Sequence, residues 1–341
     1  MLSAAASTPV FAPETIGKDP SRSAEKTFPT HEDTFGLLDQ GRKIPVIFDT
    51  DIGSDIDDTW ALLYLLRCPE LDPLMVATDA GQGQYRASLA AKFLQACDRT
   101  DVPIAIGNGG ANPKGNQAGW LGDHDLATYP GEVFPDAVDA IIEAVHGSPD
   151  PVTLVCIGGV PNIAAALAKD PSICDNARFV GMHGAIRVGY DGKPPAVAEA
   201  NVRRDPEALR KTFAATWQCS ITPLDTCGDI VLRGDRYARW MAATDRGNTA
   251  LMNNYRDWLQ RVPWLKVKPD PEKQSSTLFD VVAVYMAFSE AWLEMETLPI
   301  AVTDDGMTVV KDESPQVRCA MRWKDQDAFM DHLVYRLTTH S

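Results

Sequence analysis

The sequence predicts an α/β protein with an open, mainly parallel sheet and helices on both faces. From Lys43 onward, short apolar runs alternate with stretches of helical pattern. The chain has 341 residues, 45% of them hydrophobic, which suffices for a sizeable core. Strands that alternate with helices of this length need crossover connections, and crossovers place helices on both faces of a parallel sheet.

The expected elements follow from these patterns in chain order. Six strands are expected at Ile44–Asp49, Asp72–Thr78, Pro103–Gly107, Val152–Ile157, Arg178–Gly181 and Ser220–Pro223. The helices expected between them are Asp57–Arg67, Gln84–Asp98, Pro135–His146, Pro161–Lys169 and Pro206–Trp217. After about Leu232 the chain becomes more helical, with expected helices Arg236–Thr244, Arg246–Val262 and Thr277–Glu290. Three late strands follow, at Pro299–Thr303, Met307–Val310 and Gln316–Trp323, and then a closing helix Gln326–Thr338. We therefore expect one catalytic domain over residues 43–341 with a helical C-terminal part.

Residues 1–42 are expected to form a flexible arm ahead of this domain. Residues 13–43 are polar and rich in proline. Residues 1–12 are small and apolar and end in Val-Phe-Ala, which resembles the end of an export signal. A disordered tail explains the same residues, so both a cytoplasmic and an exported protein fit this segment.

Charge and cysteine content exclude several classes of partner. The formal net charge is −15 and the basic residues are scattered, which argues against nucleic acid or an anionic membrane as the main partner. No apolar run reaches 18 residues, so we expect no membrane span. The seven cysteines are odd in number and include no CxxC pair, which argues against a disulfide framework or a zinc ribbon. A cation site or a neutral small-molecule substrate fits this composition.

The stretch VIFDTDIGSDIDDTW, residues 46–60, places five aspartates within ten positions, beginning at the last residue of the first expected strand. Open parallel sheets bind their ligands outside the carboxyl ends of their strands. Acidic residues at a helix N-terminus complement its dipole, and Ser54 and Asp57 resemble a capping box, but this explains one or two carboxylates only. The remaining carboxylates need a proton or a cation, and oxygen ligands suit Ca²⁺ or Mg²⁺.

Two chemistries use an acidic strand end of this kind. Phosphotransfer enzymes with D-x-D-x-T match at Asp49 and Asp51, but Gly53 stands where that pattern has Thr or Val. The nucleoside hydrolase pattern D-x-D-x-G-x-D-D is matched closely, in a longer form with D-x-D-D at its end. Later segments match that family in order: Val102–Gly107, Thr153–Ala164, Val197–Asn201, Asp205–Ala208 and Ser276–Ala283. From about Lys43 to Leu337 the chain therefore resembles the inosine-uridine preferring nucleoside hydrolases.

The resemblance implies one Ca²⁺ at the base of the pocket. By motif match, Asp51, Asp58 and Asp280 would supply carboxylate oxygens, and Ile157 would supply its backbone carbonyl. Water and the ribose 2′- and 3′-hydroxyls would complete the six to eight oxygens that Ca²⁺ prefers. Asp51 would also act as the general base for the Ca²⁺-bound water.

The same resemblance assigns the sugar contacts. Asp57 would hold a ribose hydroxyl, and Asp55 would take that role if the two-residue insertion falls later in the motif. Glu199 and Asn201 would fix the 5′- and 3′-hydroxyl side of the sugar, although loop residues of this kind are often merely polar surface. Asp49 would be buried structural support.

The expected base-binding residues are less typical of the family. Phe279 occupies the position where some members carry a histidine that protonates the leaving group, and phenylalanine cannot donate a proton. Stacking of the base between Trp120 and Phe279 is one hypothesis, and simple packing of both rings is the other. Met182 and His183 match the M-G-G segment of the family, which makes His183 an alternative acid. Gln82 is the nearest amide in the loop after the second strand.

These residues predict hydrolysis of the N-glycosidic bond of ribonucleosides, or of related N-ribosides, to ribose and free base. One alternative is a Mg²⁺-dependent phosphatase with Asp49 or Asp51 as nucleophile. Another is a non-catalytic sugar- or Ca²⁺-binding protein on the same scaffold, given Phe279. The partner is expected to be a small-molecule nucleoside, and the protein a homo-oligomer, either a dimer or a tetramer.

Overall fold

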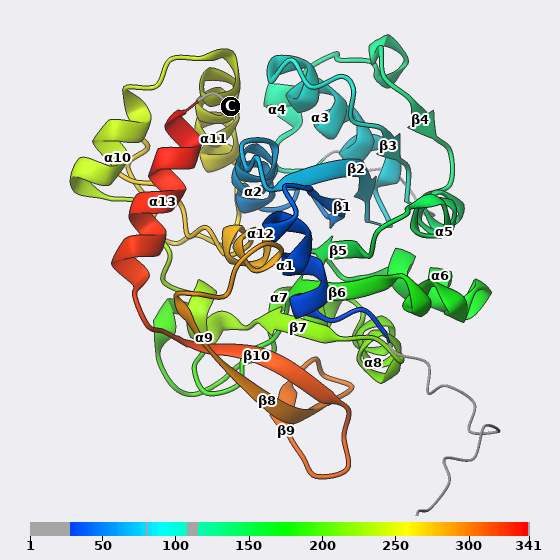
Figure 1. Cartoon of the computed structure of the whole chain (residues 1–341). Helices are drawn as coiled ribbons and strands as arrows, with labels where there is room; N and C mark the ends of the chain where they lie inside the picture. The colour runs from blue at the N-terminus through cyan, green and yellow to red at the C-terminus, as the bar shows by residue number, and fades with distance from the viewer. Residues whose placement is uncertain (1–27, 80, 108–114, 340–341) are drawn as a thin grey trace, which may run out of the picture.

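The computed structural model describes residues 28–79, 81–107 and 115–339, and its centre is a ten-stranded sheet (Figure 1). The strand order is β4-β3-β2-β1-β5-β6-β7-β10-β8-β9. The strands are β1 (Ile44–Thr50), β2 (Leu71–Thr78), β3 (Ile104–Ala105), β4 (Val133–Phe134), β5 (Val152–Cys156), β6 (Ala177–Met182), β7 (Cys219–Thr222), β8 (Leu293–Val302), β9 (Thr308–Val310) and β10 (Gln316–Trp323). All pairings from β4 to β10 are parallel, and β8 and β9 join antiparallel. The predicted mainly parallel sheet is confirmed.

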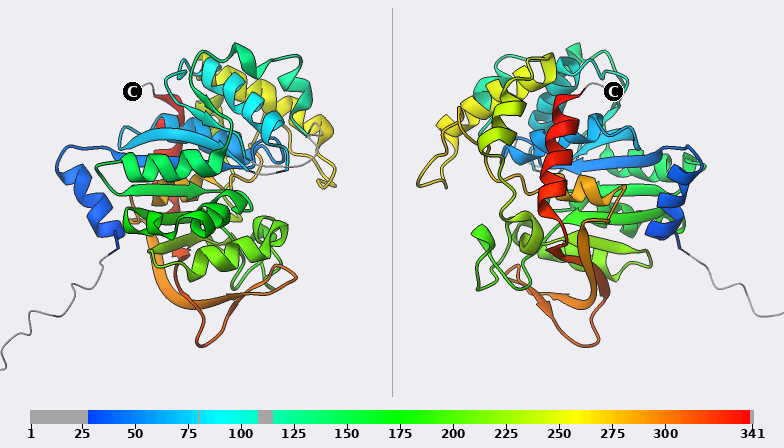
Figure 2. Two further views of the ribbon diagram at one scale, coloured as in Figure 1. Left: turned by 90° about the vertical axis from the view of Figure 1, so that its right-hand side faces the viewer. Right: turned by 60° about the vertical axis from the view of Figure 1, so that its left-hand side comes forward.

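Helices cover both faces of this sheet (Figure 2). They are α1 (His31–Asp39), α2 (Asp57–Leu66), α3 (Gly83–Ala96), α4 (Ala118–Leu121), α5 (Ala137–Gly147), α6 (Pro161–Lys169), α7 (Ala200–Arg204), α8 (Pro206–Ala214), α9 (Leu224–Cys227), α10 (Gly234–Met241), α11 (Arg246–Arg261), α12 (Val281–Met286) and α13 (Gln326–Thr338), with short 3₁₀ turns at Leu126–Thr128, Pro171–Asp175 and Tyr190–Gly192. Within the ranges described, no helix combines the length and apolar character needed to cross a bilayer.

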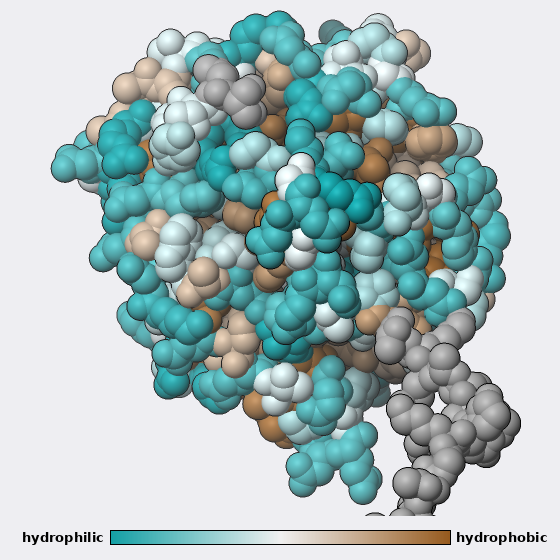
Figure 3. Space-filling model, viewed as in Figure 1, coloured by the Kyte–Doolittle hydropathy of each residue, from teal (hydrophilic) through white to brown (hydrophobic). Residues whose placement is uncertain are grey.

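Two apolar cores lie on opposite sides of the sheet. Along β1, Val46 and Phe48 belong to the core under α2, α3 and α12, whereas Ile47 belongs to the core under α5, α6 and α8. Successive strand side chains point to opposite faces, so a strand covered on both faces is apolar throughout. Every residue of β1 is buried, as this arrangement requires. On the outside, hydrophilic side chains dominate the face shown in Figure 3.

The structure differs from the expected elements mainly at their ends. Pro161–Lys169, Gln316–Trp323 and Gln326–Thr338 have the predicted bounds. The predicted helix Thr277–Glu290 is reduced to α12, whose N-cap is Asp280 and whose C-cap is Ala287. β8 begins at Leu293, six positions before the predicted Pro299, because pairing with β10 extends it. Cross-strand pairing of this kind leaves no local signal in the sequence.

The N-terminal expectation is wrong for residues 31–39, which form α1 rather than a loose arm. Thr30 and Asp33 make a reciprocal capping box: Thr30 Oγ1 accepts from the Asp33 N–H at 3.2 Å, and Asp33 Oδ2 accepts from the Thr30 N–H at 2.8 Å. The Phe35 ring lies 5.2 Å from the guanidinium carbon of the buried Arg178. Residues 1–27, with the export-signal resemblance, lie outside the described residues.

Candidate active site

The acidic loop lies between the end of β1 at Thr50 and the start of α2 at Asp57. Gly53 in this loop has a φ of +106°, which only glycine adopts without strain. A Cβ at Gly53 would also lie 2.6 Å from Tyr85 Cε1 and 2.7 Å from Leu89 Cδ1, both on α3. The glycine of the motif therefore permits both the turn and its close packing against α3.

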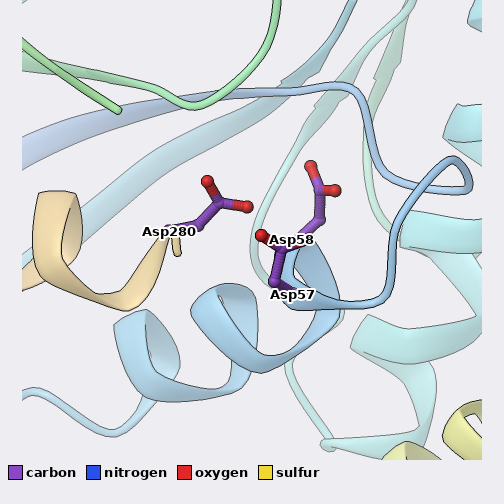
Figure 4. Close-up of side chains that lie close together, drawn as sticks. All are labelled: Asp57, Asp58 and Asp280. Atoms are coloured by element: carbon purple, nitrogen blue, oxygen red, sulfur yellow. The ribbon is translucent and has the colours of Figure 1, made fainter. Parts of the chain in front are cut away.

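Three carboxylates from distant parts of the chain meet beside this loop (Figure 4). Asp57 and Asp58 lie in the first turn of α2, and Asp280 is the N-cap of α12. One carboxylate oxygen from each lies within 4.8 Å of the others, and all three residues are buried. The structure thus brings together two of the predicted metal ligands, Asp58 and Asp280, with the predicted ribose-binding Asp57.

The pKa values of these carboxyl groups are raised. Burial is the largest cause for all three, and repulsion between neighbouring carboxylates adds to it for Asp57 and Asp280, whose pKa values lie well above the usual range. A hydrogen bond between Asp57 and Asp280 favours the charge on Asp57. Burial raises the pKa of Asp58 to about 7, although Thr50 Oγ1 donates a hydrogen bond to it. Three buried carboxyl groups need shared protons or a cation, and an oxygen-lined site suits a hard divalent ion.

Asp55 lies outside this cluster. Its carboxylate accepts a hydrogen bond from the Ile56 N–H at 2.7 Å, and the residue is half-buried. The structure therefore gives the Asp57-Asp58 pair, rather than Asp55, the position next to Asp280. This agrees with alignment of the motif on the two aspartates that begin α2.

Asp51, the predicted general base and metal ligand, is held by two arginines. Its Oδ2 accepts a hydrogen bond from Arg204 Nη1, and Arg86 Nη1 lies 3.6 Å from the same oxygen. Asp51 is buried, at the carboxyl end of β1. Within the described residues, its carboxylate is thus neutralised by guanidinium groups and is not one of the three clustered carboxylates.

The next two strands place the predicted sugar-binding residues together. Asn201 Nδ2 donates to the backbone carbonyl of Ile157 at 3.0 Å and to that of Met182 at 3.2 Å, joining the ends of β5 and β6. Glu199 caps α7 by accepting from the Asn201 N–H at 2.8 Å, and its other oxygen accepts from the Gly184 N–H at 3.1 Å. Glu199, Asn201, Ile157 and Met182 therefore form one connected group. Their roles toward a sugar stay predictions.

A second group of polar residues, Asp49, Asp79 and Asn162, joins the ends of β1 and β2 to the segment after β5. Asn162 Nδ2 donates to Asp49 Oδ2 at 2.8 Å and to the Thr78 carbonyl at 2.9 Å. Asp79, which the sequence reasoning missed, accepts from the Gly159 N–H at 2.7 Å. Burial and the neighbouring Asp79 raise the pKa of Asp49 to about 8. Asp49 thus connects β1 to α6, while Asp79 holds the glycine-rich turn.

Stacking of a base between Trp120 and Phe279 stays a prediction, and in the structure each of the two rings packs against other side chains. Trp120, on α4, lies edge-to-face with Phe93 at 6.3 Å, and Lys92 Nζ lies 4.6 Å from its ring centroid. Phe279 instead meets Tyr190 edge-to-face at 5.9 Å. Side-chain packing against α3 decides the position of Trp120, and a sequence motif does not report such packing.

Tyr190 is a residue that sequence reasoning missed. It is 43% exposed, and its hydroxyl accepts from the Ala200 N–H at 3.1 Å at the start of α7. The ring therefore lies between Phe279 and the helix that carries Asn201.

Gln82, by contrast, is half-buried at the N-terminus of α3, where its carbonyl accepts from the Arg86 N–H at 2.9 Å.

His183 is fully buried, which argues against its role as the leaving-group acid. Its Nε2 donates to the Gly158 carbonyl at 2.8 Å, and the ring lies 5.7 Å from Phe179 in the core on the other side of the sheet. Burial lowers its pKa to about 4, so the imidazole is neutral near pH 7. A neutral ring that already donates its proton to a carbonyl is a poor acid.

This histidine predicts a pH dependence of stability. The unfolded chain binds a proton near the ordinary histidine pKa of about 6.5, but the folded protein does not bind it until about 4. The free energy of unfolding should therefore fall by up to about 3 kcal/mol as the pH drops from 6.5 to 4. Urea denaturation of the wild type and of His183→Gln across that range should show a smaller decrease for the variant. Equal decreases would contradict this assignment.

Gln117, also missed by sequence reasoning, anchors the acidic loop. It is fully buried; its Nε2 donates to the Asp55 carbonyl, and its Oε1 accepts from Asn254 Nδ2 at 2.7 Å. The preceding Asn116 donates through its backbone N–H to the Gly53 carbonyl at 3.0 Å and through its side chain to the Ser54 carbonyl at 3.0 Å. Three consecutive loop carbonyls are therefore bound by residues 116–117.

Replacing Gln117 by leucine should destabilise the protein by about 2–3 kcal/mol, because the Asp55 carbonyl would lose the Gln117 donor and the buried Asn254 amide would keep only its longer bond of 3.4 Å to Thr59 Oγ1. The acidic loop should loosen, so hydrogen exchange should rise at residues 53–58. Chemical denaturation and hydrogen exchange measure both effects. Gln260→Leu, at an exposed position of α11, is the control and should change neither.

Comparison with known proteins finds matches in one family. The family model for the inosine-uridine preferring nucleoside hydrolases matches residues 46–331. The pyrimidine-specific ribonucleoside hydrolase RihA of Shewanella sp. (strain MR-4) is 36% identical over 198 residues, which are 54% of this chain and 58% of that protein. The non-specific ribonucleoside hydrolase RihC of Escherichia coli (strain SMS-3-5 / SECEC) is 29% identical over 250 residues, 67% of this chain and 80% of that protein. The matched region thus spans little more than half the length of the RihA relative.

Solved structures share the fold. The plant nucleoside hydrolase PpNRh1 superposes with a TM-score of 0.72 at 22% identity, covering 87% of this chain and 99% of the plant protein. The purine-preferring ribonucleoside hydrolase from Gardnerella vaginalis gives a TM-score of 0.69 at 21% identity, with 86% and 98% coverage. Given the family match over most of its length, the chain belongs to the inosine-uridine preferring nucleoside hydrolase family.

Proposed function

We propose that this protein hydrolyses the N-glycosidic bond of ribonucleosides, releasing ribose and the free base. The observation that carries the proposal is the convergence of Asp57, Asp58 and Asp280 beside the carboxyl ends of the central strands. Family membership supports it, since the relatives named above are ribonucleoside hydrolases. These relatives differ in their base preference, so the preferred base is left to experiment.

The donor set of the cluster fits a bound Ca²⁺. Three buried carboxyl groups with raised pKa values are the arrangement that a divalent cation would stabilise. Asp58, Asp280, the Ile157 carbonyl and Asp51 would hold the ion, with Asp51 first released from Arg204. When bound, Ca²⁺ would anchor the ribose diol and lower the pKa of a coordinated water.

The protein residues supply the rest of the chemistry. Cleavage of a glycosidic bond develops positive charge on the sugar, and the anionic carboxylates near it would stabilise that charge. Asp57 would hold a ribose hydroxyl, while Glu199 and Asn201 would orient the 5′ and 3′ sides of the ring. Asp51 would take the proton from the attacking water, a role worth about 10²–10⁴ in rate.

The leaving base needs a proton from elsewhere. Phe279 has no titratable group, and its neighbour Tyr190 is partly exposed beside it. These two rings would contact the base through apolar surface, while solvent would supply the proton to the departing nitrogen.

A reducing-sugar assay over a panel of purine and pyrimidine ribonucleosides tests this function. We expect free ribose to appear, chelator to abolish its release, and Ca²⁺ to restore it. Release of inorganic phosphate from phosphate esters would instead favour the phosphatase alternative. Ribose binding without turnover, measured by calorimetry, would favour the non-catalytic alternative.

A further inference from the structure

Arg204, the last residue of α7, reaches the predicted general base from the surface. Its Nη1 donates to Asp51 Oδ2, and the Arg204 side chain is 38% exposed whereas that of Asp51 is 7% exposed. The guanidinium therefore covers a buried carboxylate from the solvent side. Arg204 lies on the same short helix as Asn201, and therefore close to the predicted sugar contacts.

Two glycines make room for this ion pair. A Cβ at Gly159 would lie 3.2 Å from Cγ and Cδ of Arg204, so the arginine stem crosses directly over that residue. A Cβ at Gly158 would lie 3.1 Å from Asp51 Cβ and 2.6 Å from Asp79 Oδ2. Asp51 thus packs against Gly158, and Arg204 packs against Gly159. The two glycines after β5 leave the space that this ion pair occupies.

A second guanidinium, that of the buried Arg86, also lies next to Asp51. Arg86 is buried; its Nη1 donates to the Ile52 carbonyl at 3.0 Å and to Ser54 Oγ at 3.2 Å, and it lies 3.6 Å from Asp51 Oδ2. Its contacts with the acidic loop fix Arg86 in place. Arg204, by contrast, reaches solvent and needs only side-chain rotation to leave.

We propose that Arg204 is a positioning residue that competes with the divalent cation for Asp51. In the metal-free protein the ion pair neutralises Asp51 and keeps it apart from the cluster of Asp57, Asp58 and Asp280. Binding of the cation transfers Asp51 to the metal, and repulsion between the two cations moves the Arg204 guanidinium toward solvent. This inference rests on the metal site in the proposed function.

Calorimetric titration of the chelator-treated full chain with Ca²⁺ tests the competition. Arg204→Gln should bind Ca²⁺ about tenfold more tightly than the wild type, a gain of about 1.4 kcal/mol, because no ion pair has to break. Arg204→Lys should stay near the wild type. Arg203→Gln removes the same charge from the neighbouring exposed position of α7 and should change the affinity little.

The effect must also depend on Asp51. In an Asp51→Asn background the change from Arg204 to glutamine should no longer alter Ca²⁺ affinity, since the two residues act as one pair. The rise in melting temperature on Ca²⁺ addition should be larger for Arg204→Gln than for the wild type, a readout independent of turnover.

Several results would overturn the inference. Equal Ca²⁺ affinities of wild type and Arg204→Gln would do so and would leave the metal site intact. An equal gain from Arg203→Gln would show a general effect of charge rather than competition for Asp51. Failure of every variant to bind Ca²⁺ would overturn both this inference and the proposed metal site.

Discussion

Replacing Asp51 by asparagine is expected to lower kcat for ribonucleoside hydrolysis by about 10²–10⁴-fold, because asparagine cannot accept the proton of the attacking water. The amide is nearly isosteric with the carboxylate, and the fold around it is held by other contacts, including the Ile157 N–H to Asp49 carbonyl bond of 2.9 Å. Circular dichroism should therefore be unchanged. Steady-state kinetics with saturating Ca²⁺ separates the loss of kcat from weaker metal binding.

Asp49→Asn is the matched control for this substitution. Asp49 lies two residues earlier, on β1, and is fully buried, and its pKa of about 8 means that it is mostly protonated near pH 7. A neutral amide should replace it with little loss of activity. If the variants at positions 49 and 51 lose equal activity, the effect is structural and Asp51 is not the base.

Replacing Asp280 by asparagine should have opposite effects on the metal-free and the metal-loaded protein. Without metal, burial and repulsion by Asp57 and Asp58 disfavour the charge on Asp280, so the substitution should raise the melting temperature of chelator-treated protein. With metal, the loss of a carboxylate ligand should weaken Ca²⁺ binding by roughly a hundredfold or more, about 2.7 kcal/mol. Thermal unfolding with and without Ca²⁺, together with calorimetry, measures both effects.

Asp312→Asn, an exposed position in the turn between β9 and β10, is the control for loss of one negative charge and should change neither quantity. A lower melting temperature of metal-free Asp280→Asn would contradict the electrostatic conflict inferred for the cluster. Unchanged Ca²⁺ affinity would remove Asp280 from the set of ligands.

The features that were predictable from sequence have local or motif-level signals. Alternation of apolar runs and helical stretches predicted the parallel sheet, because each strand must bury both faces. Asp280 stood out as a carboxylate among apolar residues, and such a group needs a partner. The structure places it beside Asp57 and Asp58, as the order of the motifs indicated.

The features that escaped prediction depend on contacts between distant segments. Trp120 packs against Lys92 and Phe93 on α3, and no residue near Trp120 in the sequence indicates these contacts. In the sequence, nothing distinguishes Gln117 from other polar loop residues. Only the folded protein brings it against the acidic loop, where it donates to the Asp55 carbonyl. Helix α1 did carry a local signal, the Thr30–Asp33 capping box, which the proline-rich surroundings obscured.

By itself, the sequence determined the family, the fold class and the cluster of acidic residues at the strand ends, since periodicity and spaced motifs are local properties of the chain. Only the tertiary structure decided which charged groups lie beside each carboxylate. Arg204 reaches Asp51 because α7 crosses the glycine pair after β5, whereas Asp57, Asp58 and Asp280 meet because α2 and α12 begin side by side. Charge balance inside a protein depends on distances between atoms, and only packing sets those distances.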